Sequence, residues 1–413
     1  MASLDKFNPL AAETAENPYE FRRALREEAP VYQVPGAGFF IVSRYEDVMY
    51  MLCNEDVFSS KIPPGRQEEP TPEINEILAQ GYPAANTLLT NDPPSHTRFR
   101  ALVNRAFSAR RVATMATPVK TIANELIDRF AGDGRVELVN QFAVGLPLTV
   151  IADALGVQRA DMDKFKRWSD DAVAPLGGMI SYERRVECAH SLVEFQHYFA
   201  VQLHERRHEP RDDILTDLIN ARLYGVESLD TAEMLNILLQ LLVAGNETTT
   251  NLIASGMMLL LKNPPQMASL ASDASLIPNF IEESLRMESP VQQLFRQATI
   301  DTEIGGVKIP AGSIVAACYA SANRDDAQFH DADSFNPRRD NARTHLAFGQ
   351  GVHFCLGAAL ARLEARIAFE LLLVRLKNIR LAPKLNDFRH VPSLILRGLR
   401  ELHIEFDAEP VTK

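Results

Sequence analysis

The sequence predicts one large domain that is mainly α-helical and carries small β-sheets. Helical hydrophobic patterns dominate from about residue 95 to residue 290 and return at about 350–378. Short strand-like segments lie outside these regions, at about 30–50, 291–320 and 380–408. The chain of 413 residues has no repeat, no long linker and no break in composition, so we expect a single domain over residues 1–413.

The first predicted elements are a hairpin and a long loop. Residues 31–34 and 39–42 flank a Pro-Gly-Ala-Gly turn, which is typical of a short β-hairpin. Residues 61–86 contain five prolines and little periodicity, so we expect an irregular loop with about one helical turn. Further strands are expected at 295–299, 307–309, 313–317 and 402–406. The polar segment 323–348 is predicted to be a loop.

A long helix is predicted to begin after Asp230, where Asp-Thr-Ala-Glu resembles a capping box, and to end before Asn263-Pro-Pro. About 32 residues give a rod of roughly 48 Å. Its middle, Ala244 to Thr250, carries a glycine, a glutamate and three threonines. Glycine costs about 1 kcal/mol there, and threonine hydroxyls tend to bend a helix. The cluster predicts a small ligand seated against a bent helix, with an ordinary packing kink as the alternative.

Composition excludes several classes of protein. A net charge of −11 argues against a nucleic-acid partner, because phosphate-binding surfaces need a basic excess. The first thirty residues are charged and predict neither a signal peptide nor a membrane anchor. The cysteines are far apart, which favours a reducing cytosol and argues against a zinc site or a disulfide framework. They are Cys53, Cys188, Cys318 and Cys355.

Cys355 has unusual neighbours for a packing cysteine. Phe348 and three glycines, Gly349, Gly351 and Gly357, surround it in sequence. Glycines allow left-handed turns and a close approach to a bulky group. The helix that follows directs its N-terminal N–H groups towards the sulfur and so favours a thiolate. Such a thiolate is suited to be an axial ligand of haem iron; a buried free cysteine in a glycine-rich turn is the alternative.

The spacing Phe-x-x-Gly-x-x-x-Cys-x-Gly closely resembles the haem-binding loop of the cytochrome P450 superfamily. The resemblance extends over almost the whole chain. It implies a P450-type fold with haem b between the long central helix and the loop, and Cys355 as the iron ligand. The middle of the helix resembles the acid–alcohol motif of the family. By that match Ala244 and Gly245 make room for dioxygen, Thr248 hydrogen-bonds it, and Glu247 delivers protons.

Two further sets of residues match the family. Glu283 and Arg286 resemble its buried E-x-x-R pair, although most such pairs are surface contacts when taken alone. Arg339 is expected to complete this structural clamp, with Arg338 as the competitor. The residues that resemble ligands of the haem propionates are His96, Arg100, Arg296 and His345, with His353 as a further candidate.

The family positions that face the substrate are mostly aliphatic here. They predict an apolar molecule such as a terpenoid, a steroid, a fatty acid or a polyketide-like compound. Gln292 and Gln293 either bind a polar handle or cap a turn. The pocket positions are Leu88, Leu89, Leu241, Val291, Leu294, Leu394 and Ile395, together with Ala244 and Gly245.

The chain thus resembles a soluble, stand-alone bacterial haem-thiolate monooxygenase. The resemblance implies a separate electron donor, a ferredoxin with its NAD(P)H reductase, or a flavodoxin-type protein as the runner-up. A basic patch could dock an acidic donor, or it is an ordinary solvated surface. Two alternatives remain, a peroxygenase that uses hydrogen peroxide, which Glu247 and Thr248 argue against, and a non-enzymatic haem sensor. The patch consists of Arg105, Arg110, Arg111, Arg362 and Arg366.

Overall fold

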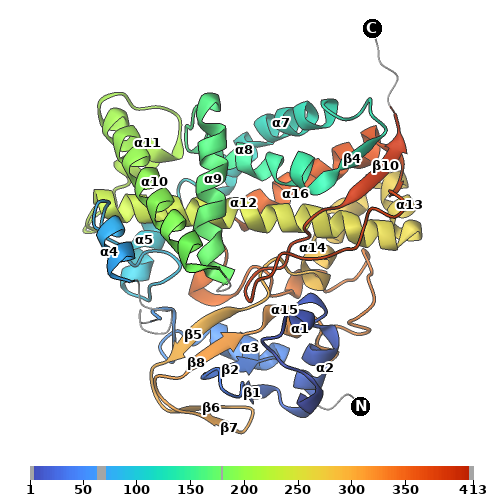
Figure 1. Ribbon diagram of the computed structural model, residues 1–413, viewed down its shortest axis with the longest axis horizontal. Helices are drawn as coiled ribbons and strands as arrows, with labels where there is room; N and C mark the ends of the chain where they lie inside the picture. The colour runs from blue at the N-terminus through green and yellow to red at the C-terminus, as the bar shows by residue number, and fades with distance from the viewer. Residues whose placement is uncertain (1–3, 63–70, 178–179, 409–413) are drawn as a thin grey trace.

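The computed structural model describes residues 4–62, 71–177 and 180–408, as a large helical region above a smaller region rich in strands (Figure 1). The α-helices are α1 Ala12–Glu16, α2 Tyr19–Glu28, α3 Tyr45–Leu52, α4 Pro72–Leu78, α5 Ser95–Val103, α6 Ala109–Thr114, α7 Ala116–Asp128, α8 Gly145–Ala154, α9 Met162–Val173, α10 Tyr182–His208, α11 Ile214–Asn220, α12 Thr231–Lys262, α13 Pro264–Ser272, α14 Ile277–Met287, α15 Tyr319–Ala322 and α16 Ala358–Arg375. The short helices are η1 Leu4–Lys6, η2 Val139–Ala143, η3 Arg159–Asp161, η4 Ala174–Gly177, η5 Ala274–Leu276, η6 Ala342–Thr344 and η7 Gly351–His353.

The strands form three small sheets. The largest has the order β1-β2-β8-β5-β3, and two smaller sheets have the orders β4-β10-β9 and β6-β7. Their bounds are β1 Val31–Gln33, β2 Phe39–Val42, β3 Phe58–Ser59, β4 Arg135–Glu137, β5 Leu294–Ala298, β6 Thr302–Ile304, β7 Val307–Ile309, β8 Ile314–Ala317, β9 Lys377–Leu381 and β10 His403–Asp407.

The predicted N-terminal hairpin is confirmed as β1 and β2, with Val31 opposite Val42. Strand β2 runs parallel to β8, so segments more than 270 residues apart share one sheet. Strands β3, β4, β6 and β9 were not predicted, because they are short and lack a clear alternation of apolar residues. In the predicted loop 61–86, the described part contains α4, with Thr71 as its N-cap; residues 63–70 lie outside the described ranges.

Helix α12 crosses the whole helical region (Figure 1) and spans 32 residues, as the sequence predicted. Asp230 and Glu233 form both hydrogen bonds of its capping box. Glu233 also accepts two hydrogen bonds from Arg98 of α5, at 2.7 and 2.9 Å. Because one carboxylate caps α12 and binds α5, it fixes the position of α5 relative to the start of the central helix.

The main core packs α12 against α8, α14 and α16, and α7 against α8 and α16. Phe280 and Phe369 meet edge to face, with ring centroids 4.7 Å apart, above Gly256 of α12. A Cβ at Gly256 would lie 2.7 Å from the Phe369 ring, so the close approach of α12 and α16 requires glycine. Each fully buried Phe contributes about 2–3 kcal/mol of burial free energy. This core holds α16, and with it the preceding cysteine loop, against the central helix.

Within the described ranges, none of the helices is long and apolar enough to cross a membrane.

Candidate active site

The middle of α12 presents small side chains to open space. Ala244 is exposed, although it lies at the centre of a helix that is mostly buried. The hydroxyl of Thr248 donates to the Ala244 carbonyl at 2.8 Å, so its oxygen still has lone pairs to accept another hydrogen bond. A Cβ on Gly245 would meet Ile151 no closer than 3.6 Å, which is an ordinary contact. Packing against Ile151 therefore does not require glycine, and the expected bend does not interrupt the helix.

Glu247 lies beside Thr248 in sequence, near side chains of α9. Burial raises the pKa of the Glu247 carboxyl above its ordinary value, and the charge of Asp170 raises it further. A hydrogen bond with Asn251 and the charge of Lys166 act in the opposite direction. A carboxyl whose pKa moves towards neutral pH can both accept and release a proton. Glu247 is therefore chemically suited to carry protons to the middle of α12.

Cys355 lies in a tight turn between η7 and α16. Its N–H donates to the carbonyl of Phe348 at 2.9 Å. Gly351 has a φ of +69°, and a Cβ there would lie 2.4 Å from the carbonyl oxygen of Leu52. Only glycine satisfies both conditions. Gly349 also has a positive φ, of +67°, so two glycines determine the path of the chain towards the cysteine.

Several donors surround the sulfur of Cys355. Burial raises the pKa of its thiol, whereas hydrogen bonds from the N–H groups of Gly357 and Ala358 lower it, as do the charges of Arg100 and Arg362. The two N–H groups belong to the start of α16, where a helix favours negative charge. A metal cation that binds Cys355 in place of the thiol proton would therefore meet N–H groups and arginines that favour the thiolate form.

Four basic side chains from α5, β5 and the cysteine loop lie near one another, and one of them, Arg100, also acts on Cys355. We call them the cation set: His96, Arg100, Arg296 and His353. The rings of His96 and His353 have centroids 4.2 Å apart. Burial lowers the pKa of His353 to about 3, and the charges of Arg296 and His96 lower it as well. Arg100 likewise lowers the pKa of His96, after burial as the main cause.

Among the described residues the cation set forms no ion pair, although the charge of Asp92 acts on both of its histidines. Both ring nitrogens of His96 are buried without a hydrogen-bond partner, and Arg296 donates only to the carbonyl of Phe295. His353 contacts the hydroxyl of Ser60 at 2.9 Å. Across the described ranges, no member of the set has a carboxylate within ion-pair distance. At pH 7 Arg100 and Arg296 carry the positive charge of the set, and His96 and His353 are neutral. Two arginines beside two neutral imidazoles suit a ligand that brings its own carboxylates, and the two propionates of haem b meet this requirement.

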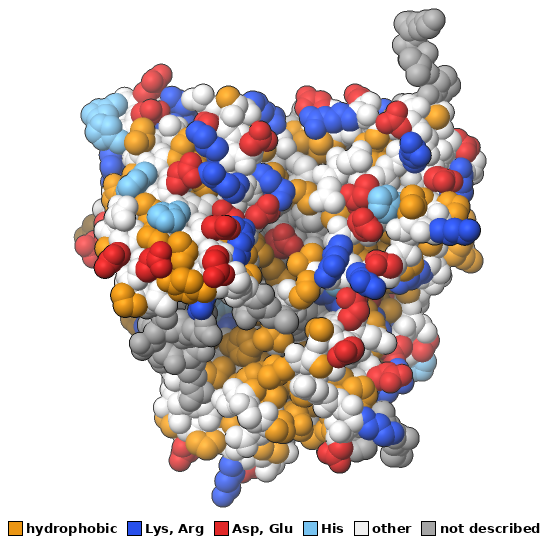
Figure 2. All heavy atoms as spheres, viewed as in Figure 1, with side chains coloured by type: hydrophobic (Ala, Val, Ile, Leu, Met, Phe, Trp, Pro, Cys, Tyr) orange, Lys and Arg blue, Asp and Glu red, His pale blue; other side chains and the backbone are white. Residues whose placement is uncertain are grey.

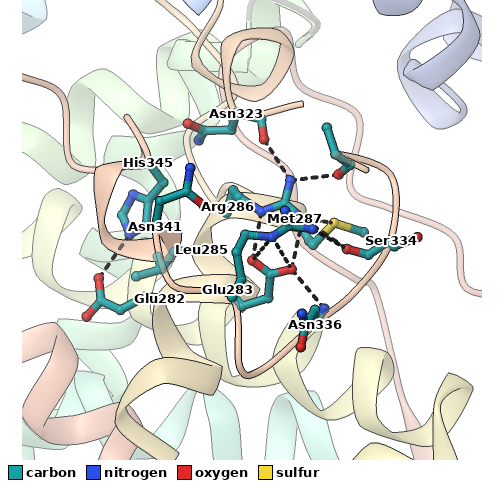
Figure 3. A network of polar contacts seen from close by, with 12 residues as sticks. Glu282, Glu283, Leu285, Arg286, Met287, Asn323, Ser334, Asn336, Asn341 and His345 are labelled. Atoms are coloured by element: carbon teal, nitrogen blue, oxygen red, sulfur yellow. Dashed lines mark hydrogen bonds and ion pairs between the residues drawn. The ribbon is translucent and has the colours of Figure 1, made fainter. Parts of the chain in front are cut away.

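Glu283, Arg286 and Arg339 form a buried network of ion pairs; Figure 3 shows Glu283 and Arg286 within it. Arg286 donates to both carboxylate oxygens of Glu283, at 2.7 and 2.9 Å, and neither side chain is exposed. Nε of Arg339 lies 3.2 Å from both oxygens, and the N–H of Asn336 donates to one of them at 2.9 Å. Arg338 is exposed. The structure thus places Arg339, and not Arg338, on Glu283.

His345 occupies a different place from the one the resemblance implied. Its Nε2 lies 3.2 Å from Glu282, and its Nδ1 accepts the N–H of Ala347 at 3.1 Å. Burial lowers the pKa of His345, so the ring is neutral at pH 7 and donates from Nε2. Both ring nitrogens are therefore used. This corrects the expectation for His345, which is not available to a propionate; the neighbour of His96 is His353.

Arg362 shares the carboxylate of Glu282. It donates to both oxygens at 2.7 and 2.8 Å, and its guanidinium lies 4.5 Å from the centroid of the Phe348 ring. Other members of the predicted basic patch are also engaged, since Arg366 pairs with Glu370 and Arg111 with Asp212. Three of the five arginines of the predicted basic patch thus form ion pairs. Two exposed members remain, Arg105 and Arg110.

The predicted pocket residues lie on four segments, namely 88–89, the middle of α12, 291–294 and 394–395. Leu88 and Leu89 are held by their N–H groups, which both donate to the side-chain oxygen of Gln240, at 3.1 and 3.2 Å. Gln292 is buried and donates to the Ser289 carbonyl, which fits the capping of a turn. Leu241 is buried on α12, whereas Val291, Leu294, Leu394 and Ile395 are partly buried. The face of the molecule drawn in Figure 2 is hollowed between α10 and the strand-rich region, and hydrophobic side chains lie inside the hollow.

The sequence interpretation missed three partners of these residues, namely Glu282, Ser60 and Asn251. Glu282 lies one position before Glu283 on a helix whose inner face is buried, and two adjacent buried carboxylates are a signal that each has its own cation. Ser60 and Asn251 carry no such signal, because their role depends on contacts between distant segments.

Comparison with known proteins agrees with this geometry. The family model described as Cytochrome P450 matches residues 179–384. Cytochrome P450 107B1 of Saccharopolyspora erythraea is 38% identical over 93% of this chain and 94% of its own length. The chain belongs to the cytochrome P450 family.

Other cytochrome P450 relatives cover the chain almost completely. The 6-deoxyerythronolide B hydroxylase of Saccharopolyspora erythraea is 36% identical over 94% of this chain and 96% of its own. The structure of cytochrome P450 CYP109Q5 from Chondromyces apiculatus superimposes with a TM-score of 0.86, at 38% identity and 98% coverage of both chains. The protein is therefore a P450 monooxygenase by family. The family implies a haem-thiolate cofactor, dioxygen and a redox partner.

Proposed function

We propose that this cytochrome P450 inserts one oxygen atom from dioxygen into an apolar small molecule, with haem b held by Cys355. The observation that carries the proposal is the convergence of the unpaired cation set with a sulfur surrounded by N–H donors. The cations suit the two propionates and the sulfur suits the iron. Phe348, Gly349, Gly351 and Gly357 shape the turn that presents the sulfur.

Each remaining residue has a separate task. Haem bound to a cysteine thiolate supplies the activation of dioxygen and the transfer of oxygen to the substrate. Ala244 and Gly245 are small residues and so leave space for dioxygen at the centre of α12. Thr248 places its hydroxyl beside that space, where it would hydrogen-bond the dioxygen. Glu247, with its raised pKa, takes protons from the side of α9 and passes them towards Thr248. The Glu283 network positions the loop and takes no part in the chemistry.

The proposed substrate is a polyketide-derived or similarly apolar compound. The predicted pocket side chains are aliphatic, so they would exclude water and bind a hydrocarbon surface. A relative that covers 96% of this chain at 35% identity is named as the monooxygenase PikC, and another relative is named as the mycinamicin IV hydroxylase/epoxidase. These names support a macrolide-like ring system as the first class to test.

The proposed electron donor is a ferredoxin that works with an NAD(P)H reductase in a reducing cytosol, and a flavodoxin-type donor is the runner-up. Arg105 and Arg110 remain as exposed cations beside α5 and α6. An acidic donor would be attracted to them more strongly at low ionic strength.

A two-part experiment tests the function. A library of macrolides, steroids, terpenoids and fatty acids is first screened for compounds that shift the Soret band. Each hit is then incubated with ferredoxin, reductase and NADH, or with hydrogen peroxide alone. We expect NADH-dependent incorporation of one labelled oxygen atom from ¹⁸O₂. Turnover with peroxide alone would identify a peroxygenase, and binding without any product would favour a sensor.

A further inference from the structure

A second cavity lies between the N-terminal helices and the loop that precedes β10. Its volume is about 630 Å³, and its walls come from α1, the start of α2, β2 and residues 389–400. Figure 1 shows α1 beside this C-terminal loop. Leu394, Gln292 and Gln293, which the sequence placed at the substrate pocket, also belong to the lining, but among the residues that the structure describes neither α12 nor the Cys355 loop contributes to it. The cavity is therefore separate from the proposed haem site.

One arginine in this cavity has no partner. Helix α2 carries three arginines, and two are engaged: Arg23 pairs with Asp333, and Arg26 donates to Ser321. Arg22 lines the cavity, and its guanidinium has neither a hydrogen bond nor an ion pair with any described residue. Burial lowers the pKa of Arg22, and the charge of Arg397 lowers it further. The folded protein thus holds a partly desolvated cation with nothing to neutralise it.

Two of the carboxylates near Arg22 are already engaged, whereas Glu13 of the cavity wall is exposed to solvent. Glu16 of the cavity wall lies 2.6 Å from Nδ1 of His390. Glu288, behind the wall, accepts from Arg397 at 3.3 Å and from the hydroxyl of Tyr19. Because these groups neutralise one another, the positive charge of Arg22 remains for a ligand that enters the cavity.

Part of the wall is apolar, and the rest carries polar and charged side chains, among them Glu13, Gln292, Gln293, Arg389 and Arg400. Phe21 and Leu25 of α2, Phe39 and Ile41 of β2, and Leu396 line the space around Arg22. A guanidinium at the end of an apolar space recognises a carboxylate in bidentate fashion, and the walls favour a hydrocarbon body. We propose that this cavity binds an aliphatic monocarboxylate, with its carboxylate on Arg22 and its chain along the phenylalanine and leucine side chains.

Decanoate is the probe, and 1-decanol is the uncharged control of the same length. Equilibrium dialysis of the haem-loaded protein counts bound molecules, while the Soret band reports separately on the haem pocket. We expect one decanoate to bind without moving the Soret band, and 1-decanol to bind at least tenfold more weakly. Arg22→Gln should raise the decanoate Kd at least tenfold, and Arg23→Gln should leave it within twofold. An unchanged Kd in Arg22→Gln, or equal binding of 1-decanol, would overturn the proposal.

A second measurement covers the case in which Arg22→Gln fails to fold. Decanoate with a diazirine at the end of its chain is photolysed on the unmodified protein, and the labelled peptides are identified by mass spectrometry. Label within residues 9–41 or 389–400 that excess decanoate removes supports the site. Label elsewhere contradicts it. Neither result depends on oxygen chemistry, so failure here leaves the proposed monooxygenase function standing.

Discussion

Arg362 and Glu282 are joined by two hydrogen bonds of 2.7 and 2.8 Å, although they lie eighty residues apart in the chain. Arg362 belongs to α16, which follows the cysteine loop, and Glu282 to α14, which carries the Glu283 network. The pair therefore ties the two helices on either side of the loop to each other. Arg362 also lies over the ring of Phe348 in the cysteine loop. Because Glu282 fixes the guanidinium, this contact in turn restrains Phe348.

The first prediction concerns the stability that Glu282 provides. Burial alone would raise its pKa, but hydrogen bonds from His345 and Arg362 outweigh burial and bring the pKa from 4.5 to about 2. The folded-state pKa is depressed, so the stabilisation is complete above pH 4.5 and is lost as the pH falls towards 2. Glu282→Gln should reduce the free energy of unfolding at pH 7 by an amount on the order of 2–3 kcal/mol. Urea unfolding should show this difference shrinking at pH 3; a constant difference would contradict the assignment.

The second prediction concerns the Glu283 network. Arg339→Ala should leave part of the Glu283 charge uncompensated in a fully buried place, and Arg286→Ala should do so more severely, at a cost of about 3–5 kcal/mol. Arg338→Ala is the matched control, because Arg338 is exposed, and its effect should stay within about 0.5 kcal/mol. Thermal unfolding and haem content measure both effects. Equal behaviour of Arg338→Ala and Arg339→Ala would show that the network is not needed.

The third prediction separates His353 from His345. His353→Ala removes a member of the cation set and should speed the loss of haem to apomyoglobin by about tenfold or more. His345→Gln removes a partner of Glu282 and should lower thermal stability while haem loss, measured well below the unfolding temperature, changes little. If haem loss responds to His345 and not to His353, the corrected assignment of the two histidines fails.

The fourth prediction concerns proton delivery. Thr248→Ala should still bind substrate and consume NADH, but the ratio of product to NADH should fall several-fold and hydrogen peroxide should appear. Glu247→Gln should slow turnover and enlarge the solvent isotope effect, because it impairs proton transfer and not binding. Thr249→Val is a control at a neighbouring buried position. Unchanged coupling in Thr248→Ala and Glu247→Gln would mean that another path carries the protons.

Local patterns predicted the parts of this molecule that short stretches of chain determine. The capping box at Asp230 and the hairpin at residues 31–42 each depend on a few neighbouring residues, and both were found where expected. The positive φ of Gly349 and Gly351 follows from the same local geometry. Such features are readable because propensity, hydrogen bonding and turn chemistry act within a few residues of each other.

Contacts between distant segments could not be read in this way. His345 and Glu282 are 63 positions apart, and nothing in the residues around His345 shows whether it faces a cofactor or a carboxylate. The choice between Arg338 and Arg339 depended on which side of a loop faces α14. Strands as short as β3 form because β5 offers a free edge, and not because two residues favour a strand.

The central claim is that Cys355 is the haem ligand, and the ferrous–carbon monoxide spectrum tests it most directly. The wild-type protein should show the absorption band near 450 nm for which the P450 family is named. Cys53→Ala, Cys188→Ala and Cys318→Ala should keep this band, and Cys355→Ala should lose it. A Cys355→Ala protein that retains haem and an unaltered thiolate-type band would contradict the account.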